Sequence, residues 1–138
     1  MQQLMTKESL DKFLNKEFPQ VSKNFKILNV SDQSFSMLMY ITEEHLRPGA
    51  TVSGPTMFLL ADVTFYLATL RIIGPKSLTV TTNCSINFLR KPNEKNLTSK
   101  ARILKLGKTL SVGDVLIYSE DINEPVAHAS LTYSIPQK

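Results

Sequence analysis

The stretch that decides the fold is VSGPTMFLLADVTFYLATLRIIG, residues 52–74. From Pro55 to Ile72 it is apolar nearly all round, which indicates a helix enclosed by protein. Proline suits the first helical position because its missing N–H would have no partner there. Gly74 and Pro75 supply the stop signal. We therefore expect one long buried helix in the middle of the chain.

This helix is not expected to cross a membrane. Asp62 lies near its middle, whereas a span needs about 20 residues with few or no charges. Residues 1–18 hold no apolar core of signal-peptide length, so a cytoplasmic location is expected.

Outward from the helix, the sequence predicts strands. An amphipathic N-terminal helix is expected within residues 1–20, over Lys7–Phe18, and Pro19 ends it. Alternating stretches predict strands at Asn24–Val30, Ser34–Ile41, Ser77–Leu89, Asn96–Leu106, Thr109–Ser119 and Val126–Ile135. The first two form a hairpin and the last four a meander in this interpretation. The order favours an α+β fold, a largely antiparallel sheet wrapped around the central helix.

Length and composition fit one domain, residues 1–138. A single cysteine, Cys84, excludes an internal disulfide framework and a cysteine-rich zinc site. His45 and His128 lie far apart without metal-ligand spacing, so no metal is expected. The net charge of +4 is too small for a nucleic-acid signature, and no nucleic-acid or membrane partner is expected.

Five short motifs, in order, resemble those of the hotdog-fold thioesterases, specifically the PaaI-like acyl-CoA thioesterase group. They are Val52-Ser53-Gly54-Pro55 with Leu60-Ala61-Asp62, Thr79-Val80-Thr81, Ile86 to Pro92, Leu106 to Leu110, and Val126 to Tyr133. The resemblance covers about residues 24–136 and implies a hotdog core there. It also implies a dimer whose sheets join, often paired again as a dimer of dimers, with active sites between subunits.

The chain departs from the family pattern in the loop before the helix. The family's histidine and second glycine are Ser53 and Pro55 here, and its frequent asparagine is Arg47. Gly54 and Asp62 are both kept. The resemblance therefore implies a site in which Arg47, Ser53 and Pro55 contact the substrate.

Asp62 is the first candidate for chemistry. It is the only charge between Arg47 and Arg71, and an isolated carboxylate on an apolar helix is costly to bury. A buried carboxylate suits a general base. The structural alternative is a carboxylate that accepts loop N–H groups or pairs with Arg47.

Gly54 is the candidate oxyanion donor, because its N–H would point out of a helix N-terminus. Pro55 has no N–H, so the loop offers one donor fewer than Gly-Gly. A plain turn glycine is the alternative. Ser53 lacks the frame of a serine nucleophile and suits a helix cap.

Thr81 matches the family position that faces the nucleophilic water. The alternation also places it with Asn83, Ser85 and Asn87 on a polar face, opposite Val80, Cys84 and Ile86. A solvated sheet surface is therefore the alternative reading.

Residues 90–108 hold seven basic side chains and one acidic one. Near turns, Arg90, Lys91 and Lys108 are candidates for the phosphates of coenzyme A. An ordinary solvated hairpin face explains the same charges.

Together these residues predict an acyl-CoA thioesterase in which Asp62 acts as base or nucleophile, with Gly54 and Thr81 assisting. No cofactor is expected beyond the coenzyme A of the substrate. Two other classes stay open, a non-catalytic acyl-CoA-binding sensor or adaptor and a purely structural protein. A hydratase of the same fold is disfavoured because no aspartate–histidine pair has suitable spacing.

Overall fold

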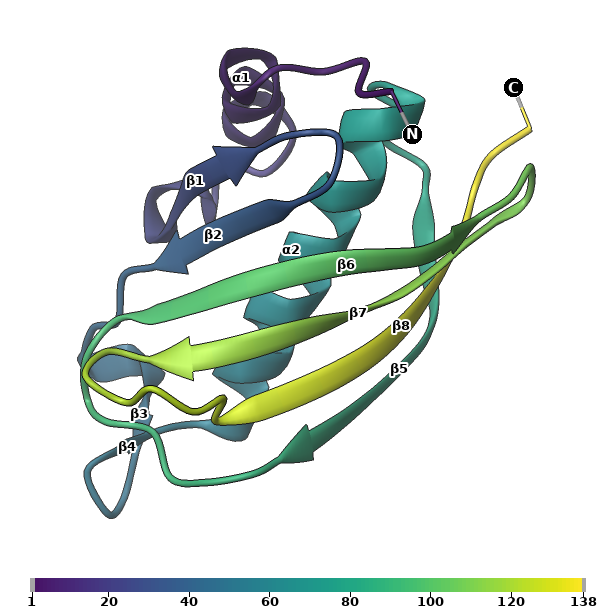
Figure 1. Cartoon of the computed structure of the whole chain (residues 1–138). Helices are drawn as coiled ribbons and strands as arrows, with labels where there is room; N and C mark the ends of the chain where they lie inside the picture. Colours follow the sequence, from purple (N-terminus) through teal and green to yellow (C-terminus); the bar gives the residue numbers. More distant parts are fainter. Residues whose placement is uncertain (1, 138) are drawn as a thin grey trace.

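A computed structural model describes residues 2–137 and confirms the α+β architecture. A six-stranded antiparallel sheet curves around one long helix, α2 (Gly54–Ile73), as Figure 1 shows. The strands are β1 (Phe25–Val30), β2 (Phe35–Met39), β5 (Val80–Phe88), β6 (Leu97–Leu106), β7 (Leu110–Ser119) and β8 (Ala127–Ser134). The N-terminal helix α1 (Lys7–Glu17) packs against β1.

The loop before α2 is more ordered than its glycines and proline suggest. It contains a 3₁₀ turn, Glu43–His45, and a two-stranded hairpin of β3 (Leu46–Arg47) and β4 (Thr51–Val52). Another 3₁₀ turn, Ser22–Asn24, follows α1.

The core lies between α2 and the concave face of the sheet. Leu60, Phe65 and Leu67 of α2 are fully buried there. By length and composition α2 could span a membrane, but 72% of its most apolar window is buried within the protein. The all-round apolar pattern is therefore that of a core helix.

The predicted meander of four strands is wrong for its first member. The sheet order is β1-β2-β6-β7-β8-β5, so β5 lies at the edge beside β8 and away from β6. The segment joining β5 to β6 is longer than a hairpin turn. The edge of β6 that does not face β7 pairs with β2. Only β6, β7 and β8 form a meander.

The predicted faces of β5 are also wrong at the start of the strand, because the strand contains a β-bulge. The register against β8 shifts between Thr81 and Asn83, so Thr82 is the extra residue. A bulge reverses the alternation on one side of it. Val80 is consequently 52% exposed, and the Thr81 side chain turns toward α2, where the regular alternation placed it on the opposite face.

The outer face of the sheet carries a charged cluster centred on Asp114. Arg102 donates from Nη2 at 2.8 Å, and Nε2 of His128 lies 3.0 Å from the same oxygen. Burial raises the pKa of Asp114, but these two neighbours outweigh it and hold that pKa below its usual value.

Candidate active site

The Asp62 side chain is held by two hydroxyl donors from two strands. Thr81 Oγ1 of β5 donates to Asp62 Oδ1 at 2.7 Å, and Tyr133 Oη of β8 donates to the same atom at 2.5 Å. The tyrosine hydroxyl also lies 2.8 Å from the Asp62 carbonyl oxygen. Among residues 2–137 no donor contacts Oδ2, so this oxygen is open to a water or a substrate.

Tyr133 is suited to remain a donor. Its side chain is only 2% exposed, and burial, with the charge of Asp62, raises its pKa far above the usual tyrosine value. The phenol therefore stays protonated at any physiological pH. Neither sequence alternative for Asp62 holds, because its partners are hydroxyls and not loop N–H groups or Arg47.

Asp62 and Thr81 line a cavity of about 590 Å³. Most of its wall is apolar and comes from α1, from the turn after it and from α2. Tyr66 of α2 is in this wall, whereas its neighbours Phe65 and Leu67 are fully buried in the core.

Gly54 opens α2 and leaves one backbone donor free. Ser53 caps the helix, its hydroxyl accepting from Thr56 N–H at 3.3 Å, and Pro55 has no N–H. Among the residues described, nothing accepts from Gly54 N–H, which points out of a 20-residue helix. A Cβ at Gly54 would lie 3.2 Å from the Phe88 ring, so the close approach of β5 favours glycine here.

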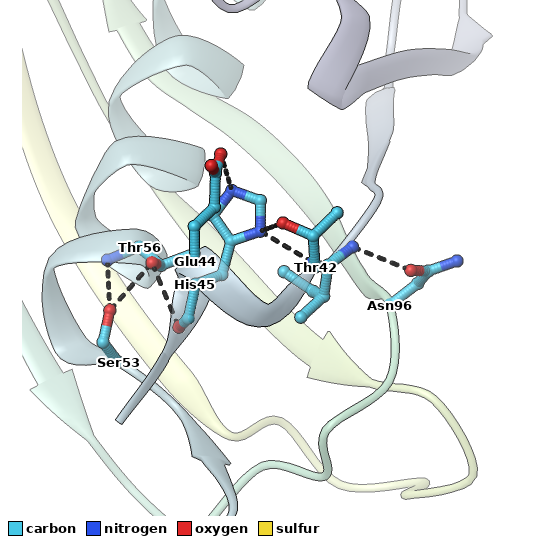
Figure 2. Close-up of polar contacts among 7 residues, drawn as sticks. Thr42, Glu44, His45, Ser53, Thr56 and Asn96 are labelled. Atoms are coloured by element: carbon cyan, nitrogen blue, oxygen red, sulfur yellow. Dashed lines mark hydrogen bonds and ion pairs between the residues drawn. The ribbon is translucent and has the colours of Figure 1, made fainter. Parts of the chain in front are cut away.

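Buried His45 fixes the loop that leads into this helix (Figure 2). Its Nδ1 accepts from Thr42 N–H at 2.9 Å, while Nε2 lies 3.7 Å from a Glu44 carboxylate oxygen. Its carbonyl accepts from Ser53 N–H at 2.9 Å and from Thr56 Oγ1. His45 therefore caps the turn before this helix.

A second cavity, of about 580 Å³, opens beside Gly54 and has a basic rim. Arg47, Arg90 and Lys91 line it, together with Phe88 and Leu89 of the β5 end. The Arg90 guanidinium is fixed by the carbonyl of Pro125 and lies 3.9 Å from Glu124. Three cations near one helix N-terminus create a place for an anion.

Lys108 does not join these cations within one chain. It lies in the turn between β6 and β7, whereas Arg90 contacts the turn after β7. At about 3.4 Å per residue, the ten-residue strand β7 separates the two turns by roughly 30 Å.

The two cavities hold different parts of the predicted chemistry. Gly54 and Asp62 are eight residues apart on one straight helix, so about 12 Å of helix rise separates them. Within one chain they cannot both touch a single carbonyl group. The structure thus places an open carboxylate oxygen in one cavity and a free helix-terminal N–H with three cations in the other.

Two residues of the site escaped the sequence analysis. Tyr133 looked like an ordinary core residue of the last strand, and His45 looked like a loop residue. Tyr133 acts through a contact with Asp62, which lies 71 residues earlier in the chain, and His45 acts through a ring nitrogen that accepts from Thr42, three residues before it. Among residues 2–137, no three His, Cys, Asp or Glu side chains gather as metal ligands.

Comparison with known proteins identifies the class of protein. A family model described as the thioesterase superfamily matches residues 49–126. A candidate thioesterase from Silicibacter sp. TM1040 is 46% identical, with 99% of this chain and 95% of that chain covered and a TM-score of 0.91. A search of curated proteins finds no significant match.

More distant structures share the fold. A thioesterase from Haemophilus influenzae is 20% identical over 98% of this chain and 93% of that one, with a TM-score of 0.84. The Escherichia coli PaaI protein of the phenylacetic acid degradation operon is 21% identical over 94% and 93%, with a TM-score of 0.78. The fold is therefore the hotdog fold. The chain belongs to the thioesterase superfamily, and the resemblance drawn from its motifs is confirmed.

Proposed function

We propose that the protein is an acyl-CoA thioesterase that hydrolyses its substrate to a free acid and coenzyme A. The observation that carries the proposal is the Asp62 carboxylate, which has Oδ1 fixed by Thr81 and Tyr133 and Oδ2 open beside an apolar cavity. A fixed carboxylate next to apolar space suits the removal of a proton from water or direct attack on a thioester carbon.

In the general-base route, Asp62 takes a proton from water as the water oxygen bonds to the thioester carbon. The carbonyl electrons move to oxygen and return as the C–S bond breaks. The proton then reaches the departing thiolate, which leaves as the thiol of coenzyme A. In the nucleophilic route, Oδ2 bonds to the thioester carbon and the C–S bond breaks, so that coenzyme A leaves as a thiolate. Water then hydrolyses the resulting anhydride, which releases the acid, restores the Asp62 carboxylate and supplies the proton that the thiolate takes up.

Gly54 N–H is proposed to stabilise the negative oxygen formed in either route. The end of a long helix favours negative charge, and loss of one oxyanion donor typically costs about 3–4 kcal/mol of activation free energy. The rim of Arg47, Arg90 and Lys91 beside Gly54 is proposed to bind the phosphates of coenzyme A.

Two copies of the chain are proposed to complete the site. Among the residues described, β5 pairs on one side only, and its exposed Phe88 lies with Pro55, Phe58 and Ile86 around an apolar hollow. An exposed apolar edge strand favours pairing with another chain. Gly54 packs at the end of β5 and Asp62 at its start, so antiparallel pairing of two β5 edges would bring Gly54 toward Asp62 of the partner subunit.

The first experiment measures thiol release from a panel of acyl-CoAs, with Asp62→Asn as the test variant. Asp11→Asn, an exposed position on α1, is the matched control. Turnover that Asp62→Asn abolishes and Asp11→Asn leaves unchanged supports the proposal. Turnover that survives in Asp62→Asn contradicts the role of the carboxylate.

Subunit complementation tests the shared site. Gly54→Pro chains, which lack the N–H, and Asp62→Asn chains are each expected to be inactive, whereas mixed dimers hold one intact site. Random mixing should return roughly one quarter of the wild-type activity. No return of activity in a verified heterodimer would contradict the shared site.

A sensor is the second candidate, favoured by the loop before α2. The Ser53 hydroxyl caps the helix and Pro55 has no N–H, so few hydrogen-bond donors are left in this loop to stabilise an oxyanion. Acyl-CoA binding without turnover in wild type and Asp62→Asn would identify this function. If the protein neither binds nor hydrolyses acyl-CoA, a structural role is favoured.

A further inference from the structure

The cavity beside Asp62 is built from two helices that are far apart in sequence. Leu14 and Phe18 come from α1 and its end, and Leu59, Val63 and Tyr66 come from α2. Its volume of about 590 Å³ lies in the range of roughly 300–1,000 Å³ that is usual for small-molecule sites. Its occupant must therefore fit against apolar walls.

The tyrosine and threonine hydroxyls in this wall are already engaged. Tyr66 Oη donates to the Ser77 carbonyl at 3.0 Å, Tyr133 Oη and Thr81 Oγ1 donate to Asp62, and Thr79 Oγ1 donates to the Lys76 carbonyl. Both tyrosines therefore offer mainly ring surface to an occupant. The polar groups that an occupant would meet are then Asp62 Oδ2 and the exposed side chains of Gln20 and Ser77, and the rest of the wall is apolar.

Phe18 is placed by the end of α1 to act as a wall. Its N–H donates to the Leu14 carbonyl at 2.9 Å, and its ring meets the Tyr66 ring edge-on with centroids 5.6 Å apart. It nevertheless remains 38% exposed. Apolar surface that is held in place but left open suits a ligand better than it suits a core.

We propose that this cavity binds the acyl part of the substrate, and that α1 makes the protein selective for uncharged, medium-length apolar acyl groups. The inference rests on the proposed function and deepens it. The reacting carbon lies beside Asp62, and the chain extends toward Phe18. A terminal carboxylate or hydroxyl would be stranded against apolar walls, and so substrates that carry one are rejected.

The N-terminal part of the wall precedes the residues that the family model matches. That model matches residues 49–126, which include Asp62, whereas Leu14, Phe18 and Val21 come before them.

The test compares kcat/KM for straight-chain acyl-CoAs from acetyl to palmitoyl, with succinyl-CoA against butyryl-CoA as the charged pair. Each methylene that enters the cavity should raise kcat/KM roughly three- to fourfold until the cavity is full. Succinyl-CoA should be hydrolysed far more slowly than butyryl-CoA. A flat chain-length profile, or equal rates for the charged pair, would overturn the inference.

Variants locate the effect. Val63→Phe fills the cavity and should shorten the preferred chain, and Leu59→Phe repeats the test should Val63→Phe not fold. Phe18→Ala opens the wall and should lengthen the preferred chain. Tyr40→Ala, at a similarly exposed aromatic outside the cavity (41%), is the matched control and should leave the profile unchanged. A profile that none of the cavity variants moves contradicts the inference.

The failure of this inference differs from the failure of the proposed function. Hydrolysis with a flat profile overturns only the acyl cavity. Absence of hydrolysis overturns the proposed function, and the cavity is then tested by calorimetric binding of the same acyl-CoA series. Affinity that rises with chain length and falls in Val63→Phe supports the cavity, and affinity independent of both overturns it.

Discussion

Replacing Tyr133 with phenylalanine removes one hydroxyl and leaves the buried ring in place. The hydroxyl donates to a carboxylate at 2.5 Å, and hydrogen bonds to charged groups contribute about 1.5–3 kcal/mol. Asp62 is half-buried and keeps its bond from Thr81, so the lower end applies. We expect the free energy of unfolding to fall by about 1.5 kcal/mol, which lowers Tm by about 4–7 °C for a domain of this size.

Thioesterase activity should fall together with the stability of Tyr133→Phe. If the same 1.5 kcal/mol is lost from the transition state, kcat/KM falls about tenfold. The assays are thermal unfolding and thiol release, with Tyr118→Phe on the outer face of the sheet as the matched control. Unchanged Tm and unchanged rate would refute the assignment of Tyr133 as the donor, and a lower Tm at full rate would show that its bond is only structural.

The same variant has a signature at high pH. The pKa of Tyr133 is raised in the folded protein, so its contribution to stability is complete below the unfolded value of about 10. As the pH rises above that value, the unfolded chain releases this proton and the folded chain keeps it. Wild type should therefore lose more stability than Tyr133→Phe between pH 9 and pH 11 (an approximate window).

Three further predictions concern the frame around the site. His45→Ala removes the acceptor for the partly buried Thr42 N–H and should cost about 1 kcal/mol of stability in denaturant unfolding and lower kcat/KM, whereas Glu44→Gln should change neither. Gly113→Ala places a Cβ 2.1 Å from a backbone oxygen of β6 and should cost about 3 kcal/mol, whereas Gly107→Ala, with 3.7 Å to the nearest atom, should be nearly neutral by the same measurement. Asp114→Asn should lower the urea midpoint at pH 7. The difference in midpoint between this variant and wild type should shrink as the pH falls below about 4. The reason is that Asp114, whose pKa is lowered in the folded protein, stabilises the folded state only while its carboxyl is charged. A difference that does not shrink as the pH falls would contradict this account.

The central helix and the strand positions could be predicted from the sequence because their signals are local. The apolar run with Pro55 at its start and Gly74 at its end predicts α2 to within a residue or so. The place of β5 could not be predicted in the same way. Which strands pair depends on contacts between segments far apart in the chain, and the alternation of a strand does not name its neighbour.

The candidate site was predictable in its residue types but not in its geometry. Asp62 stands out as a lone charge on an apolar helix, and Gly54 stands out before a proline. The bulge at Thr82 leaves no mark in the alternation of β5, so the contact from Thr81 to Asp62 could be found only in the structure. Tyr133 was missed for the related reason that its partner, Asp62, lies 71 residues away in the chain. His45 caps the turn that begins after Thr42, three residues before it, and its contacts with Ser53 and Thr56 form only when the loop folds.

The bulge at Thr82 places Thr81 on the face of β5 that a regular strand of the same length would give to Thr82. Deleting Thr82 would restore regular pairing with β8 and would leave Thr81 opposite Tyr133, on the side of Asp62. Both hydroxyls would then still reach the carboxylate. A relative whose β5 is one residue shorter and has no bulge can therefore hold the same arrangement, so the length of this strand is no guide to whether the site is present.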